Sequence, residues 1–199
     1  MRAWKITQAL TFACLSGCGS GPSPVQGPEA PLRPARQRTT AKQVLDYLAS
    51  LPLRSERRLL SGQNVGHGPT AEKGFDAYVV RLHEATGTWP AFVTADYAFG
   101  SLDAGWIRQI NEIVKRHWDA GGLVSINIAT LNNPFTGGNC KDRGEVDLVS
   151  LLTPGTRANA AWLADLDAIA AGLAMLRDAG VIVLWRPLHE MNVADFWWG

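Results

Sequence analysis

The stretch VLWRPLHEMN, residues 183–192, begins as an apolar run and ends in polar and charged side chains. A short apolar run of this kind is typical of a strand buried in a sheet. Its end brings together Arg186, His189, Glu190 and Asn192. In barrels of parallel strands the active site is built from the carboxyl ends of the strands. The stretch therefore predicts a strand that ends at a site for binding or catalysis.

Helices and strands alternate along most of the chain. Apolar residues at helical spacing predict helices over residues 41–51, 71–85, 102–120 and 162–179. The apolar runs between them predict strands over residues 59–63, 91–97, 123–129 and 181–190. Because each pair of strands is joined by a helical crossover, the sheet is expected to be parallel.

Polar residues help to choose between a doubly wound sheet and a barrel. They stand at or just after the carboxyl end of each expected strand: Gln63-Asn64, Asp96-Tyr97, Asn132-Asn133 and His189-Glu190. No glycine-rich phosphate loop follows the first strand, which argues against nucleotide binding. A complete barrel needs about 250 residues. We expect a partial (β/α)8 TIM-type barrel of about four βα units, with open edges and an exposed apolar inner face.

The amino terminus differs in composition from the rest. Residues 1–18 have basic residues, an apolar stretch and the sequence Leu-Ser-Gly-Cys at 15–18, which predicts a signal peptide with a lipobox that acylates Cys18. Residues 19–40 are rich in Pro, Gly and Ser, as in a linker. We expect an exported lipoprotein at the cell surface or in the periplasm, held to a membrane by its lipid alone. A plain secretory signal is the alternative.

Charge and the metal-binding residue types set limits on partners. The sequence has 19 basic and 18 acidic residues, for a formal net charge of +1, which argues against nucleic-acid binding. His67, His83 and His117 lack the spacing of metal ligands, and Cys140 has no second cysteine nearby. No metal or cofactor is therefore expected.

The sequence WRPLHEMNVADFWWG, residues 185–199, closely resembles the W-R-P-x-H-E-M-N-G-x-W-F-W-W-G pattern of glycoside hydrolase family 26. Shorter stretches resemble the family in the same order: LLSGQ at 59–63, ADY at 95–97 and NNPFTGGN at 132–139. The resemblance covers residues 41–199, which are expected to form a truncated catalytic domain.

This resemblance implies a TIM-type barrel and a retaining glycosidase that cleaves β-linked polysaccharide, as the family's β-1,4-mannanases do. Glu190 matches the general acid/base and His189 a position that contacts substrate. The family's nucleophile lies on the seventh strand, which is expected beyond Gly199. Other candidates for substrate binding are Asn192, Trp197, Trp198 and Asp96.

A strictly alternating fourth strand would place Leu184, Arg186, Leu188 and Glu190 on one face. Arg186 is then expected to support the site as the partner of a carboxylate, because a buried charge needs a partner to offset its desolvation.

Departures from the family pattern leave the substrate open. Family mannanases carry Trp-His shortly before the Asn-Pro of the third loop, where this chain has Ala129-Thr130. Val193 replaces a glycine and Asp195 a tryptophan. The alternatives are a β-1,3-xylanase or a mixed-linkage β-glucanase of the same family. A different class of function is an inactive fragment or carbohydrate-binding remnant.

Overall fold

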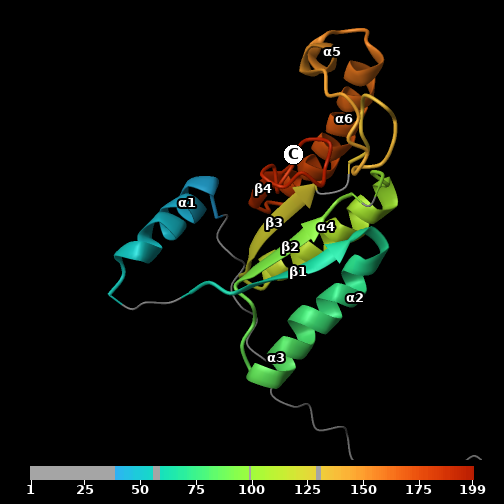
Figure 1. Cartoon of the computed structure of the whole chain (residues 1–199). Coiled ribbons are helices and arrows are strands. Elements are labelled where there is room, and N and C mark those ends of the chain that lie inside the picture. The colour runs from blue at the N-terminus through green and yellow to red at the C-terminus, as the bar shows by residue number, and fades with distance from the viewer. Residues whose placement is uncertain (1–38, 56–58, 99, 129–130) are drawn as a thin grey trace, which may run out of the picture. The chain divides into compact units, whose positions relative to one another are not determined.

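We describe the protein from a computed structural model, which places residues 39–55, 59–98, 100–128 and 131–199. The expected signal peptide with Cys18 and most of the expected linker lie outside the described residues. In the described part, four strands form one parallel sheet in the order β1-β2-β3-β4 (Figure 1). The parallel α/β architecture predicted from the sequence is confirmed.

The strands have five or six residues each and are separated along the chain by helices. They are β1 (Gly62–His67), β2 (Phe92–Asp96), β3 (Leu123–Ile128) and β4 (Val183–Pro187). The α-helices are α1 (Ala41–Ser50), α2 (Ala71–Phe75), α3 (Arg81–Thr86), α4 (Ala104–Asp119), α5 (Leu148–Leu152) and α6 (Arg157–Asp178). Short 3-10 helices occupy Leu51–Leu53 and Gly68–Thr70, and a π-helical turn at Asp76–Val80 joins α2 to α3.

Most predicted elements occur close to their expected bounds, but the first strand and the last long helix differ. The first strand was expected at 59–63 but runs from Gly62 to His67, so Gln63-Asn64 lies within the strand and not at its carboxyl end. The last long helix begins at Arg157, earlier than expected, because the Thr156 side chain accepts from the backbone of Asn159 and caps it.

The fourth strand ends earlier than its apolar run suggests. Strand β4 stops at Pro187, and the following Leu188 and Glu190 have φ angles of 42° and 62°. This left-handed region is uncommon for residues other than glycine, and such conformations cluster at functional sites. The expectation that strict alternation continues from Arg186 to Glu190 is therefore wrong, because the backbone turns between them.

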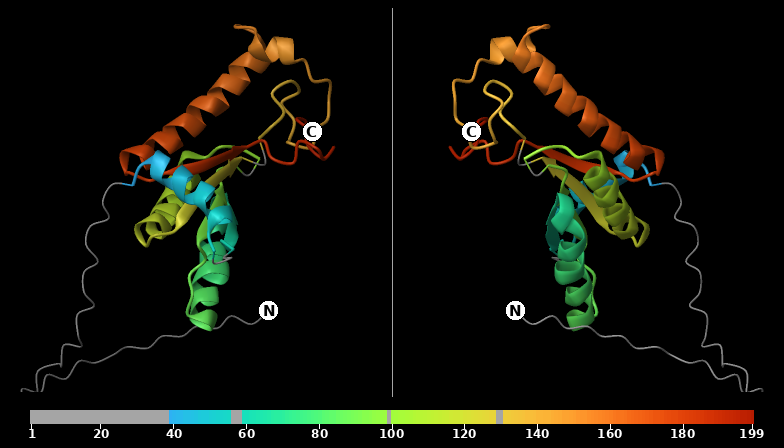
Figure 2. Two further views of the ribbon diagram at one scale, coloured as in Figure 1. Left: turned by 90° about the vertical axis from the view of Figure 1, so that its left-hand side faces the viewer. Right: turned by 90° about the vertical axis from the view of Figure 1, so that its right-hand side faces the viewer.

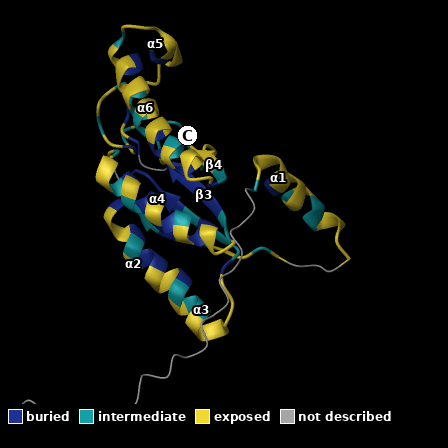
Figure 3. Ribbon diagram, turned by 180° about the vertical axis from the view of Figure 1, so that it is seen from behind, coloured by how far each residue is buried: buried dark blue, intermediate teal, exposed yellow. Residues whose placement is uncertain are grey.

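One face of the sheet is covered by helices and is apolar. Figures 2 and 3 show α2, α4 and α6 on this outer face, with buried strand residues beneath them. The Tyr97 hydroxyl donates to Asn111 Oδ1 of α4 at 2.6 Å, and Asn111 Nδ2 donates to the Gly172 carbonyl of α6 at 2.9 Å. These two bonds join the end of β2 to both helices. Burial raises the pKa of the Tyr97 hydroxyl well above its usual value.

The opposite, inner face of the sheet carries both polar and apolar side chains. Because Val93, Ala95 and Tyr97 are fully buried under the helices, alternation places the side chains between them on the inner face. With the matching positions of the neighbouring strands in register, the polar members are Asn64, Thr94, Asp96, Ser125, Asn127 and Arg186. The same alternation places Phe92, Leu123 and Leu184 on the inner face, so the apolar inner face expected from the sequence is present only in part.

Candidate active site

A row of polar residues crosses the carboxyl ends of all four strands. His67 of β1 lies in register with Asp96 of β2, Asp96 with Asn127 of β3, and Asn127 with Arg186 of β4. An irregularity in β1 between Asn64 and His67 brings the histidine into this row. Parallel strands present their carboxyl ends on one side, so the row forms a polar edge where a substrate can be bound.

The two central members of the row are buried. Asp96 is 6% exposed, and its carboxylate accepts from the backbone of Ala98 at 3.1 Å. Asn127 is 1% exposed, and its Oδ1 has no hydrogen-bond partner within the described part of the chain. A buried acceptor without a donor costs about 1–3 kcal/mol. The sequence analysis did not identify Asn127, which the register places beside Asp96 in the polar row.

The residue that matches the general acid lies in a turn directly after β4. The backbone of Val193 donates to the Glu190 carbonyl at 2.9 Å and closes this turn. Glu190 and Asn192 are exposed, so both can be reached from solvent. His189 is half-buried, and its Nδ1 has no hydrogen-bond partner among the described residues. The turn thus presents a carboxyl, an imidazole and an amide from neighbouring positions.

Trp197 packs inside the protein. It is 5% exposed, and its ring makes edge contacts with Phe135 and Trp162 at centroid distances of 5.9 and 6.2 Å. Its indole N–H donates to the Leu131 carbonyl at 3.2 Å, and its backbone donates to the Cys140 carbonyl at 3.0 Å. The expectation that Trp197 offers an open surface to a sugar is therefore corrected: it anchors the carboxyl-terminal segment.

Trp198 connects this anchor to the turn that carries Glu190. Its indole N–H donates to the His189 carbonyl at 3.0 Å, next to Glu190. Its ring stacks on Phe196 at 4.6 Å and meets Trp197 edge-on at 5.4 Å. Because Trp198 is half-buried, it is the more accessible of the two adjacent indoles. Trp198 therefore both supports the turn and offers surface beside it.

The loop after β3 is fixed by Asn133, which is fully buried. Its Nδ2 donates to the Asp142 carbonyl at 2.6 Å, and its Oδ1 accepts from the backbones of Phe135 and Thr136 at 2.8 and 3.3 Å. Because the side chain is fully buried and its Oδ1 already accepts two bonds, Asn133 shapes the loop that Trp197 contacts. Ala129-Thr130, where family mannanases have Trp-His, lie outside the described residues.

Two further expectations concern charge and metals. Arg186 is exposed at the open edge of β4 and forms no ion pair within the described ranges, so its supporting role stays a prediction. Among the described residues, no group of three or more His, Cys, Asp or Glu side chains could hold a metal ion.

Fold and site together define a class of protein. A parallel sheet with helices on its outer face, and with polar residues at the carboxyl ends of its strands, has the arrangement of a TIM-barrel enzyme. The solved relatives share this arrangement: a mannanase from Bacillus subtilis superposes with a TM-score of 0.68 at 32% identity, over 84% of this chain and 52% of that one. The four strands correspond to part of such a barrel.

The chain belongs to glycosyl hydrolase family 26, whose model matches residues 33–199. A mannan endo-1,4-β-mannosidase of Bacillus subtilis is 37% identical over 175 residues, which are 85% of this chain and 48% of that protein. One from Caldalkalibacillus mannanilyticus is 35% identical over 80% of this chain and 32% of its own length. The chain thus spans about half the length, or less, of these relatives, and the family resemblance seen in residues 185–199 is confirmed.

Proposed function

We propose that the protein is a retaining endo-β-1,4-mannanase in which Glu190 is the general acid/base. The observation that carries this proposal is the place of Glu190. It follows the last residue of β4 closely, beside the polar row, and stands exposed in a turn held by Trp198. In TIM-barrel enzymes the catalytic residues come from the carboxyl ends of the strands.

In this mechanism Glu190 protonates the oxygen of the leaving sugar and later removes a proton from the attacking water. His189, Asn192, Trp198 and Asp96 bind the sugars on either side of the cleaved bond. Retention also requires a second carboxylate about 5–5.5 Å from the first, which attacks the anomeric carbon. We assign that nucleophile to a strand beyond Gly199, as the family resemblance implies.

Mannan is the preferred substrate in this proposal because the curated relatives share that activity by name. A solved β-mannanase from a symbiotic protist of the termite Reticulitermes speratus was complexed with gluco-manno-oligosaccharide. It superposes with a TM-score of 0.64 at 30% identity, over 79% of this chain and 51% of that one. Val193 and Asp195, which depart from the family pattern in the catalytic turn, keep β-1,3-xylan and mixed-linkage β-glucan as competing substrates. The same departures favour a non-catalytic carbohydrate-binding protein as the second candidate function.

The full-length protein should be incubated with β-1,4-mannan, β-1,3-xylan and mixed-linkage β-glucan. We expect mannan to lose viscosity faster than reducing ends accumulate, as endo cleavage requires, and new ends to appear first in the β configuration by NMR. Faster cleavage of β-1,3-xylan or mixed-linkage β-glucan than of mannan would assign that glycan as the substrate. Binding of mannan without cleavage would support the carbohydrate-binding alternative.

We also propose that the protein is exported and anchored by a lipid on Cys18. The sequence Leu-Ser-Gly-Cys at 15–18 and the Pro-rich stretch after it support this proposal. In a bacterial host, labelled fatty acid should enter the protein and be lost in Cys18→Ser. Because one acyl chain binds a membrane only marginally, more than one is expected for stable retention. Equal labelling of the variant would contradict the anchor.

A further inference from the structure

The two peptide planes on either side of the Glu190 Cα atom are each held by a hydrogen bond. The plane before it contains the His189 carbonyl, which accepts from the Trp198 indole N–H at 3.0 Å. The plane after it contains the Glu190 carbonyl, which accepts from the Val193 backbone N–H at 2.9 Å. Because a peptide unit is planar, the directions of these two planes set φ and ψ of Glu190. The two bonds therefore set the direction in which the Glu190 side chain leaves the backbone.

The backbone conformation that these bonds hold is an unfavourable one. Leu188 and Glu190 have φ angles of 42° and 62°. The left-handed region costs free energy for a residue with a Cβ atom, and it persists only where surrounding contacts fix it. A turn without those contacts would relax toward negative φ. The bond from Trp198 is one contact that opposes this relaxation, and it comes from a residue outside the turn.

Neighbouring rings fix the orientation of the Trp198 indole. It stacks on Phe196 at 4.6 Å with an interplanar angle of 2°, and it meets Trp197 edge-on at 5.4 Å with an angle of 90°. The chain also passes close to the turn one residue later, because a Cβ atom on Gly199 would collide with the Val193 carbonyl. The carboxyl-terminal segment thus closes back on the turn, with the indole N–H held toward it.

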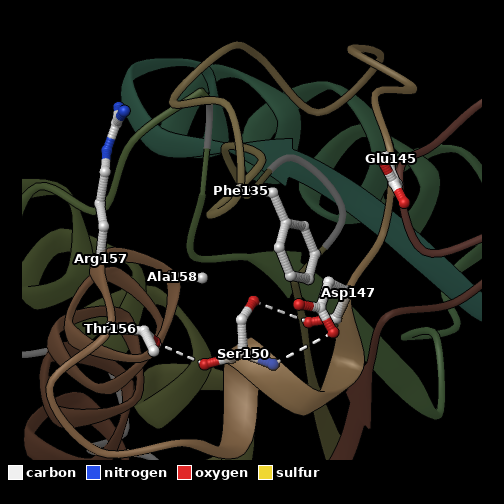
Figure 4. Close-up of a pocket in the computed structure, with 7 residues that line it drawn as sticks. All are labelled: Phe135, Glu145, Asp147, Ser150, Thr156, Arg157 and Ala158. Atoms are coloured by element: carbon white, nitrogen blue, oxygen red, sulfur yellow. Dashed lines mark hydrogen bonds between the residues drawn. The ribbon is translucent and has the colours of Figure 1, made fainter.

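Trp197, which supports this indole, rests on the loop after β3 through the Phe135 ring at 5.9 Å. Phe135 lines a pocket of about 420 Å³ together with Asp147, Ser150 and Thr156. The Asp147 carboxylate accepts from the Ser150 backbone at 3.2 Å, and Thr156 Oγ1 donates to the Ser150 carbonyl at 2.5 Å (Figure 4). The contacts behind Trp197 are therefore ordered.

We propose that Trp198 is a positioning residue of the glycosidase reaction, whose indole N–H holds the Glu190 carboxyl where it protonates the leaving oxygen. This inference rests on the proposed function, because it assigns a support to the general acid of that reaction. A general acid must lie within hydrogen-bond reach of the atom that it protonates. Loss of the N–H should therefore weaken protonation, whereas loss of the ring would weaken any stacking on a sugar.

The test removes the N–H of Trp198 in the full-length protein in two ways. One variant is Trp198→Phe, and the other carries 3-benzothienylalanine at this position, which keeps the bicyclic ring and has sulfur in place of N–H. We expect kcat/KM on mannopentaose to fall about 3–10-fold, as the loss of one hydrogen bond implies. On 2,4-dinitrophenyl β-mannoside it should fall less than about twofold, because dinitrophenolate leaves without a proton.

The leaving group separates this role from the alternatives. Lost sugar stacking, or a general loss of structure, would lower kcat/KM on both substrates alike, and melting temperatures report the second directly. Trp162→Phe is the matched control, since it changes a ring that meets Trp197 edge-on at 6.2 Å in the same cluster, and it should keep the dependence on the leaving group. Equal losses on both substrates, or no loss with either replacement of Trp198, would overturn the proposal.

Hydrogen exchange separates this inference from the proposed activity. The Val193 amide, which bonds the Glu190 carbonyl, should exchange faster in the benzothienylalanine protein, whereas the Trp197 amide, which bonds the Cys140 carbonyl at 3.0 Å, should not. If the parent protein cleaves no glycan, the catalytic proposal fails, and faster exchange still shows that Trp198 holds the turn. If glycan is cleaved but exchange and leaving-group dependence match the parent, the role of Trp198 fails alone.

Discussion

The two faces of the sheet differ in kind although they share the same strands. On the outer face, Val93, Ala95 and Tyr97 of β2 are fully buried beneath helices. On the inner side, Asp96 stands in register with Asn127 and Arg186 at the carboxyl ends. Since a strand sends alternate side chains to opposite faces, one segment serves both purposes. The outer side chains hold the fold, and the inner ones form the candidate site.

This difference makes stability and activity separable at most positions. Trp197 is an exception. It is buried like the outer residues, but it contacts Trp198, which bonds the His189 carbonyl next to Glu190. Variants on each side, and at this junction, therefore test the comparison.

The largest effect is expected from Trp197→Ala. The change removes a buried indole, its hydrogen bond to the Leu131 carbonyl and its ring contacts, so the free energy of unfolding should fall by about 3–5 kcal/mol. Activity should fall as well, because the support of the Glu190 turn is lost. Denaturant unfolding and mannan hydrolysis measure the two. The control is Trp89→Ala, whose side chain is 48% exposed and stacks on His83. A stability loss no larger than in this control would contradict the role of Trp197.

A smaller effect, confined to stability, is expected from Tyr97→Phe. The change leaves Asn111 Oδ1, which is buried, without its donor and should cost about 1–3 kcal/mol. Because Tyr97 lies on the outer face, kcat of the folded protein should not change. The matched control is Tyr47→Phe on α1, where the tyrosine is 37% exposed. Reduced kcat at full stability would show that the two faces are coupled.

The smallest effect concerns pH. Burial lowers the pKa of His117, against a weaker raising effect of its bond to the Ala91 carbonyl. The unfolded chain therefore binds a proton at a pH where the folded chain does not. Stability should be full above pH about 6.5 and should decline as the pH falls below it, levelling under the folded pKa. His117→Gln should flatten this decline in melting temperature. An unchanged slope in His117→Gln would refute the assignment.

The order of elements was predictable from the sequence because the helices have clear apolar periodicity. The first strand was misplaced because Leu59 and Leu60 suggested a buried run, whereas Leu59 is 98% exposed and Val65 is the buried residue. Helix α5 was missed because its five residues are too few for a period to show.

The candidate site was predicted in its residues more than in its geometry. The motif pointed to Glu190 and His189. The left-handed turn could not be predicted, because the residue types at these positions do not normally adopt positive φ angles. Asn127 was overlooked because only the register of β3 with its neighbours places it beside Asp96. The sequence suggests that Trp197 stacks on a sugar, and only the structure shows that its side chain is buried in the protein.

The central claim is that Glu190 is the acid/base of a retaining glycosidase, and azide rescue of Glu190→Ala tests it most directly. Activity on mannan should fall about 10²–10⁴-fold. On an aryl β-mannoside with a good leaving group, the rate of the step that releases the phenolate should fall far less, because that step needs little protonation. Azide should restore turnover and give a β-mannosyl azide of retained configuration, whereas Asp195→Asn, an exposed change in the same segment, should neither lose as much nor respond. Equal losses on both substrates, a lowered melting temperature and no response to azide would contradict the account and assign Glu190 a structural role.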